Sequence, residues 1–153
     1  MESEEVRRRL EAALGRLAEK DSYLFENNLS ERCIASRLAM YLQDVFAEFS
    51  VDVEYNRKGA NPKVLELPEK CANYRTQNGE VLVLPDIIVH HRGEEGPNIL
   101  ALELKKTTNR DSRECDRMRI RAFRGQLNYG SAALIECETR RGYKPLATII
   151  EWL

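Results

Sequence analysis

Two apolar segments separated by a short polar turn constrain the fold of this chain more than any other feature. Residues 81–90 and 98–105 are rich in branched and aliphatic side chains, and the glycines and acids at 93–96 are typical of a turn. We therefore predict two neighbouring strands of a hairpin, with an irregularity at Pro85 in the first strand. Strands this apolar are expected to be buried, so a charged side chain within them requires a specific reason.

Three charged residues nevertheless lie in these segments. Asp86 belongs to the first, and Glu103 and Lys105 are two residues apart in the second, so they project from the same face of that strand. Two carboxylates and an amine on one patch of sheet suit metal-assisted phosphodiester cleavage, with the carboxylates as hard oxygen ligands for Mg²⁺. Lys105 would orient or deprotonate the attacking water, or offset charge on the phosphorus. The alternative is an exposed strand end with a cross-strand ion pair.

The rest of the chain predicts helices around this pair of strands. The expected elements are three helices, at 3–19, 30–49 and 111–128, and three further strands, at 51–55, 131–137 and 145–152. Residues 56–80 are typical of a loop-rich insertion. The order ααβββαββ predicts one α/β domain over residues 1–153, with a mixed central sheet flanked by helices in three layers. Residues 1–20 would form an N-terminal helical extension.

The charged residues of the two strands also form a family pattern. Pro85-Asp86, a gap of 16 residues and Glu103-Leu104-Lys105 resemble the signature of the PD-(D/E)xK nuclease superfamily, and the predicted order of elements resembles its restriction-endonuclease-like core. The resemblance implies that Asp86 and Glu103 bind Mg²⁺ or Mn²⁺ together with the backbone carbonyl of Leu104. It also implies that Lys105 is catalytic and that the chain is an Mg-dependent endonuclease-type hydrolase.

A fourth acidic residue fits this resemblance. Many members of the superfamily carry a Glu near the start of the helix that precedes the first core strand, and Glu31 follows the candidate N-cap Ser30 here. Glu31 shares a helical stripe with Ile34 and Leu38, where a carboxylate is unusual for packing but suitable for binding a metal ion or water. We therefore include Glu31 among the candidate catalytic and metal-binding residues. The alternative is a first-turn acid that only favours the helix dipole.

The basic residues are concentrated in the second part of the chain. The net charge is −1, but residues from Lys105 onward carry 11 Lys and Arg against 6 Asp and Glu, while residues 1–104 carry 13 against 19. Guanidinium groups suit phosphate oxygens, and such contacts give affinity without sequence information. The candidate nucleic-acid contacts are Arg113, Arg117, Arg121, Arg124, Arg57 and Lys58. The alternative is a solvated helix face on which neighbouring acids neutralise the arginines.

The third predicted helix has an apolar stripe that we expect to face the core. Its members are Cys115, Met118, Ala122 and Leu127. The four cysteines, Cys33, Cys71, Cys115 and Cys137, include no C-x-x-C pair, so we expect reduced and mostly buried thiols. We expect His90 and His91 to be surface residues at a strand end, and contact with a substrate is the alternative. We do not expect a zinc site, because no third ligand lies at suitable spacing.

The absence of long apolar segments excludes a membrane span, since no run of 18 apolar residues occurs. The charged N-terminal residues also lack the apolar core of a signal peptide, so we expect a cytoplasmic protein without a membrane partner.

The sequence thus predicts a metal-dependent nuclease that hydrolyses phosphodiester bonds in DNA. The rival interpretation is a catalytically inactive nuclease-fold protein that binds nucleic acid or a protein partner, and a third is an unrelated α/β interaction domain with a fortuitous motif. No separate DNA-recognition domain is visible in a chain of 153 residues. Sequence specificity would therefore come from loops, from a homodimer or from a larger complex.

Overall fold

The computed structural model describes residues 1–55, 57–58, 61–62, 67–71, 74–75, 81–82, 84–93 and 97–153, and it describes residues 57–58, 61–62, 69, 74–75 and 81–82 by their backbone alone. A five-stranded sheet with the strand order β1-β6-β7-β8-β9 forms the centre of the molecule. These strands are β1 Ser50–Val53, β6 Ile87–His90, β7 Asn98–Lys106, β8 Tyr129–Cys137 and β9 Ala147–Trp152. Strands β7 and β8 run parallel and the other neighbours run antiparallel, so the sheet is mixed.

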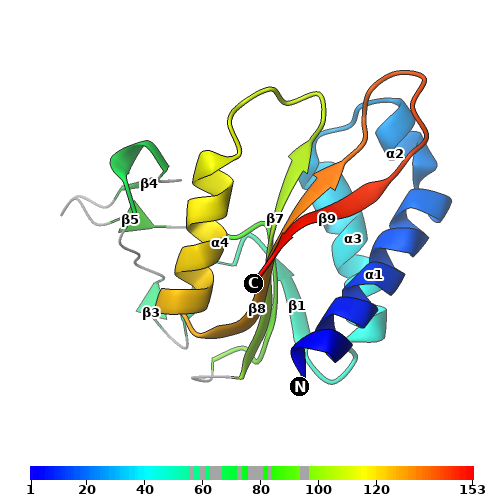
Figure 1. Ribbon diagram of the computed structural model, residues 1–153. Coiled ribbons are helices and arrows are strands. Elements are labelled where there is room, and N and C mark those ends of the chain that lie inside the picture. Colours follow the sequence, from blue (N-terminus) through cyan, green and yellow to red (C-terminus); the bar gives the residue numbers. More distant parts are fainter. Residues whose placement is uncertain are drawn as a thin grey trace.

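Helices cover both faces of this sheet, as Figure 1 shows: α1 and α3 lie on one side and α4 on the other. The helices are α1 Ser3–Lys20, α2 Ser22–Glu26, α3 Glu31–Val45 and α4 Glu114–Gln126. The predicted three-layer α/β architecture with a mixed sheet is therefore confirmed. The short helix α2 was not predicted, because its five residues are too few to show a helical period.

The described part of the insertion contains short elements only. They are β2 Arg57–Lys58, β3 Asn61–Pro62, the 3₁₀ turn η1 Glu69–Cys71, β4 Tyr74–Arg75 and β5 Val81–Leu82. Strands β2 and β3 form one two-stranded sheet, and β4 and β5 form another.

Alternation along β7 divides the core into two halves. Leu100, Leu102 and Leu104 are buried with the apolar faces of α1 and α3, whereas Ala101 is buried with the apolar side chains of α4. Because successive side chains of a strand point to opposite faces, Glu103 lies on the α4 side of the sheet. The alternation of side chains along β7, which the sequence predicted, therefore decides that α4 covers the Glu103 carboxylate.

The predicted hairpin is confirmed, but its first strand is shorter than residues 81–90. Strand β6 begins at Ile87 and pairs with β7 in the register Ile87↔Leu102 and Val89↔Leu100, whereas β5 belongs to the separate sheet with β4. The break falls at Pro85 and Asp86, where Pro85 has no N–H to give to a strand ladder. Asp86 therefore precedes β6 instead of lying within it.

Two predicted helix ends also differ from the structure. Helix α3 stops at Val45 rather than near residue 49, although Phe46 and Phe49 still pack against the core. Helix α4 stops at Gln126, and the chain turns through Asn128, which has a φ of 56°, so that Gly130 already belongs to β8. An asparagine tolerates this left-handed conformation better than most residues, so it serves here as the helix stop.

Within the described residues, no helix combines the length and the apolar character that a membrane crossing requires.

The N-cap of α3 holds the helix that carries Glu31. The Ser30 hydroxyl accepts a hydrogen bond from the Cys33 N–H at 3.1 Å. We expect Ser30→Ala to lower the free energy of unfolding by about 1 kcal/mol, because one N-terminal N–H loses its acceptor. Urea denaturation measures this change. Ser36→Ala, in the exposed interior of the same helix, is the matched control and should be close to neutral. Equal effects of the two substitutions would contradict the capping role.

Candidate active site

The register of β6 and β7 brings Asp86 and Glu103 together. Ile87 pairs with Leu102, so the preceding residue of one strand lies across from the following residue of the other. The Asp86 carboxylate accepts a hydrogen bond from the Leu104 N–H at 2.7 Å, and the Asp86 carbonyl accepts one from the Glu54 N–H at 3.2 Å. The bend at Asp86 thus directs its side chain to the β7 backbone beside Glu103.

Removal from water dominates the electrostatics of these two carboxyl groups. Glu103 is only 4% exposed, and burial together with the nearby Asp86 raises its pKa well above the ordinary range. Burial also raises the pKa of Asp86 to about 6, although the hydrogen bond from Leu104 acts in the opposite direction. Glu103 Oε1 accepts no hydrogen bond from any described residue. A buried carboxylate without a full set of donors favours either a proton or a cation.

Lys105 lies next to this pair but contacts a different acid. Its Nζ is 3.4 Å from both carboxylate oxygens of Asp116, a residue of α4 that is 1% exposed. The side chain of Lys105 is itself mostly buried. The candidate amine is therefore held between β7 and the first turn of α4.

Arg119 is the second cation of the site, and the sequence analysis did not assign it a role there. Its Nε is 3.4 Å from Glu103 Oε2, and its Nη2 donates to Asp116 Oδ1 at 2.6 Å. Its Nη1 donates to the backbone carbonyl of Cys71 at 3.1 Å. Arg119 thus links Glu103, Asp116 and the η1 turn.

Asp116 and Arg119 were missed because the predicted apolar stripe of α4 is only partly correct. Ala122 and Leu127 are buried as predicted, but Cys115 and Met118 are only partly buried. The other buried residues of α4 are Asp116, Ile120 and Phe123. Asp116, Ile120 and Phe123 follow the helical spacing i, i+4, i+7, which was the available signal. An acid at the start of this stripe would then have predicted a buried partner for a strand cation.

Glu31 reaches the same end of the sheet from the opposite helix layer. Its carboxylate accepts a hydrogen bond from the Lys106 N–H at 3.2 Å, and its charge contributes to the raised pKa of Asp86. Helix α3 therefore places Glu31 close enough to act on Asp86 electrostatically. The four predicted residues Asp86, Glu103, Lys105 and Glu31 all lie near this end of β7.

The donor set of the site fits a hard divalent cation in part. Asp86 and Glu103 offer carboxylate oxygens, and Mg²⁺ is commonly bound by one or two carboxylates while substrate phosphates and water complete its shell. In the part of the chain that the structure describes, no three His, Cys, Asp or Glu side chains form a group that could hold a metal ion. Asp86 and Glu103 are therefore the pair that could bind the cation, and Arg119 is the group that now neutralises Glu103.

The predicted arginine contacts differ in their surroundings. Arg113 is mostly buried and donates to the carbonyls of Asn109, Asp111 and Lys106. Arg117 and Arg121 both pair with Glu151 of β9, at 2.8 and 3.3 Å. Arg124, near the other end of α4, is exposed and donates to the Tyr129 carbonyl. The side chains of Arg57 and Lys58 lie outside the described residues.

The histidines belong to other surroundings. His90 is buried, and its Nε2 lies 2.7 Å from Asp52 Oδ2, to which Arg92 Nε also donates at 2.9 Å. His91 packs on the ring of Phe49. The expectation of surface residues is therefore wrong for His90, because the neighbouring β1 supplies a carboxylate that the sequence alone did not connect to it.

The expectation of reduced thiols is wrong for two cysteines. Cys71 of η1 and Cys115 of α4 form a disulfide, with Cα atoms 5.0 Å apart, while Cys33 and Cys137 are free. The two bonded cysteines are 44 residues apart in the sequence, and only the packing of η1 against α4 brings them together. The disulfide therefore attaches the insertion to the first turn of the helix that carries Asp116.

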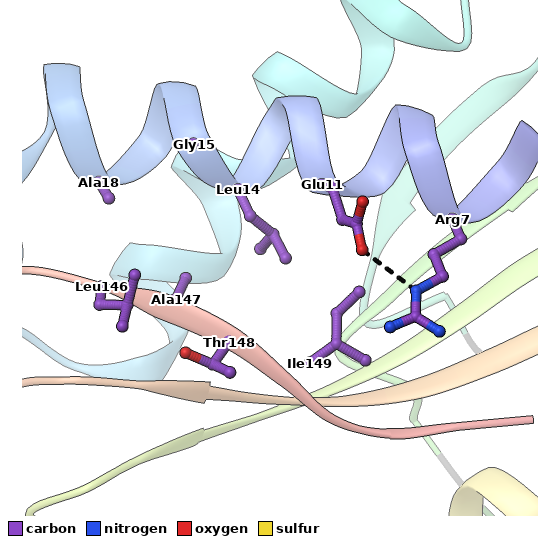
Figure 2. A pocket seen from close by; sticks show the side chains of 9 residues that line it. All are labelled: Arg7, Glu11, Leu14, Gly15, Ala18, Leu146, Ala147, Thr148 and Ile149. Atoms are coloured by element: carbon purple, nitrogen blue, oxygen red, sulfur yellow. Dashed lines mark hydrogen bonds and ion pairs between the residues drawn. The ribbon is translucent and has the colours of Figure 1, made fainter.

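A separate hollow of about 490 Å³ lies between α1 and β9. Figure 2 shows Leu14 and Ile149 pointing into it from the two elements, with the Arg7–Glu11 ion pair toward one end. Its lining contains none of the four predicted catalytic residues. The carboxylate cluster is thus a distinct feature of the molecule.

Comparisons of the chain with protein-family models, with curated proteins and with solved structures gave no significant match. The assignment of function therefore depends on the site itself.

Asp86 should make stability depend on pH in an unusual direction. Between pH of about 4 and 6 the unfolded chain has lost the proton of this carboxyl while the folded protein retains it, so stability falls as the pH rises and the loss is complete above the folded pKa of about 6. We expect Asp86→Asn to remove this penalty, giving a gain in unfolding free energy that is roughly 2 kcal/mol larger near pH 8 than near pH 4 without metal.

Urea denaturation at both pH values measures this gain. Asp44→Asn, at an exposed position, is the control and should show no comparable difference between the two pH values. A gain for Asp86→Asn that does not change with pH would contradict the raised pKa.

Proposed function

We propose that this chain is a metal-dependent nuclease that hydrolyses phosphodiester bonds in DNA, with a core of the restriction-endonuclease-like type. The observation that supports this proposal most strongly is the proximity of Asp86, just before β6, to Glu103, near the end of β7, in a surrounding that raises both pKa values. Perturbed carboxyl groups that converge on one site are typical of functional centres.

Each residue then has a separate role. Asp86, Glu103 and the Leu104 carbonyl would hold Mg²⁺ or Mn²⁺, with Glu31 assisting at the same end of the sheet. Such an ion supplies Lewis acidity, which polarises a phosphoryl oxygen of the substrate. Lys105, whose Nζ is held 3.4 Å from Asp116, would orient the attacking water or offset the charge that develops on the phosphorus.

A non-catalytic nuclease-fold protein is the second candidate, and one observation favours it. Arg119 neutralises Glu103, and Asp116 neutralises Lys105, so the cations and carboxylates of the site already satisfy one another in part. A protein that only binds nucleic acid or a protein partner would retain such pairs for stability. The presence of Asp86, and of a Glu103 Oε1 that accepts no hydrogen bond from the described residues, argues for the enzyme, because a binding module gains nothing from them.

A cleavage assay tests the proposal. Plasmid and single-stranded DNA are incubated with the protein in Mg²⁺ or Mn²⁺, with RNA in parallel, and we expect cleavage of DNA. Lys105→Ala and Asp86→Ala should each lower the rate by on the order of 100-fold or more. Lys144→Ala, an exposed lysine in the segment between β8 and β9, is the control and should cleave normally.

The outcomes separate the candidates. Cleavage that neither substitution lowers would indicate a contaminating nuclease and contradict the assignment of the site. Binding of Mn²⁺ without turnover would favour the non-catalytic protein, and absence of both would overturn the whole proposal. Cleavage of RNA alone would retain the chemistry and replace the substrate.

Phosphate contacts by α4 give a further expectation. Arg121 is 62% exposed and Arg124 is exposed, so both can reach a bound phosphate, whereas Arg113 is committed to backbone carbonyls. We expect the DNA affinity to fall with increasing salt, and Arg121→Ala or Arg124→Ala to reduce the slope by about one in a plot of log K against log salt. Fluorescence anisotropy with labelled DNA measures the slope. Unchanged slopes would remove these arginines from the interface.

We propose that the chain acts in a complex with DNA. A homodimer or a larger complex would supply the sequence specificity. One centre per chain would cut one strand, so cutting of both strands would require two copies.

A further inference from the structure

Arg119 lies next to Glu103, at a position where a metal cation would also be attracted. Its guanidinium contacts three acceptors from three segments: Glu103 of β7, Asp116 of α4 and the Cys71 carbonyl of η1. The contact to Glu103 is the longest, at 3.4 Å, and the other two are 2.6 and 3.1 Å. Asp116 and Cys71 therefore hold the guanidinium against Glu103 more than Glu103 itself does.

The Cys71 carbonyl is fixed relative to Arg119 by a covalent bond. Cys115 is bonded to Cys71 and precedes Arg119 by four residues, which is about one turn of the same helix. Among the described contacts near this junction is the ion pair of Lys70 with Glu114, at 3.4 Å, but both side chains are more than half exposed. An exposed ion pair contributes little to holding a segment. The disulfide is thus the strongest described link between η1 and α4.

We infer that Arg119 is a placeholder cation for Glu103, and that the Cys71–Cys115 disulfide keeps it there, so that reduction of the disulfide favours binding of a divalent metal ion. This inference rests on the proposed metal site. In the oxidised protein, metal binding at Glu103 has to displace a guanidinium that η1 and Asp116 hold in place. In the reduced protein, η1 is free to leave α4, and the Cys71 carbonyl no longer anchors Arg119. Asp116 alone then holds the guanidinium, so a metal ion displaces it from Glu103 more easily.

The redox step is an ordinary thiol–disulfide exchange with a dithiol reductant. Cys115 is partly exposed while Cys71 is 1% exposed, so the first thiolate attacks the sulfur of Cys115. The second thiol of the reductant then resolves the mixed disulfide. Cys71 and Cys115 gain two electrons and two protons, and the reductant leaves as its own disulfide. No other oxidant or reductant is required.

The test compares Mn²⁺ binding to the full chain in its oxidised and reduced forms by isothermal titration calorimetry. The dithiol is removed under nitrogen before titration, so that it does not compete for the metal. We expect Mn²⁺ to bind about tenfold more tightly to the reduced form, which corresponds to about 1.4 kcal/mol. Thiol titration of the unfolded oxidised chain should detect the two free cysteines, Cys33 and Cys137, and detection of all four thiols would overturn the inference.

Three variants assign the effect to the proposed contacts. Cys71→Ser combined with Cys115→Ser should bind Mn²⁺ like the reduced form whether or not a reductant is present. Cys33→Ser, which leaves the disulfide intact, is the matched control and should retain the tenfold difference. Arg119→Gln should bind tightly in both redox states, and the double serine variant keeps the test valid if Arg119→Gln does not fold.

The failure of this inference is distinct from the failure of the proposed function. Equal Mn²⁺ affinity of the oxidised and reduced forms, with binding lost in Asp86→Ala, would overturn the redox inference and leave the metal site in place. Tighter binding by the oxidised form would also overturn it. If the reduced form, the double serine variant and Arg119→Gln all fail to bind Mn²⁺, both the metal site and the inference are overturned.

Discussion

The burial of acidic side chains at the start of β6 and near the end of β7 is the constraint on which the rest of the site depends. Asp86 and Glu103 meet where two central strands of the sheet leave the core, and α4 closes over Glu103 from above the sheet. Carboxylates withdrawn from water need protons, hydrogen-bond donors or cations. The Leu104 N–H donates a hydrogen bond to one oxygen of Asp86, and the Arg119 guanidinium pairs with one oxygen of Glu103.

Among the described residues, the surrounding charges do not balance these acids completely. Asp86, Glu103 and Asp116 are three carboxyl groups, while Lys105 and Arg119 are the two described cations that contact Glu103 or Asp116. Glu31 adds another negative charge from α3 and contributes to the raised pKa of Asp86. Excess negative charge in a partly buried site is the electrostatic condition under which a divalent cation binds favourably. The same excess makes the fold less stable when no cation is bound.

The insertion between β1 and β6 also affects the charges of the site, because η1 is attached to α4. Two contacts of the η1 turn act on Arg119: the Cys71 carbonyl accepts a hydrogen bond from the guanidinium, and the disulfide anchors the turn to α4. A segment between β1 and β6 therefore influences where a guanidinium of α4 lies. Coupling of this kind needs a contiguous chain of contacts, and here the chain consists of one disulfide and one hydrogen bond.

The sequence by itself predicted the five strands of the central sheet, the residues that share a face of β7 and the candidate catalytic residues. Period-2 alternation predicted that Glu103 and Lys105 share one face, because this geometry is local to the strand. The spacing of apolar residues predicted α1, α3 and the layered architecture for the same reason. Asp86 was identified because an acid beside a buried apolar run has few structural explanations.

Only the tertiary structure decided which charges meet. The pairs Lys105–Asp116, Arg119–Glu103 and Cys71–Cys115 join segments whose distance depends on how α4 and η1 pack, and no local pattern encodes that distance. The rotation of α4 was decisive, since apolar and charged residues alternate along it closely enough for two stripes to be plausible. Burial of Phe123 and Ile120 against the sheet selects one of them and thereby turns Asp116 and Arg119 toward the carboxylates.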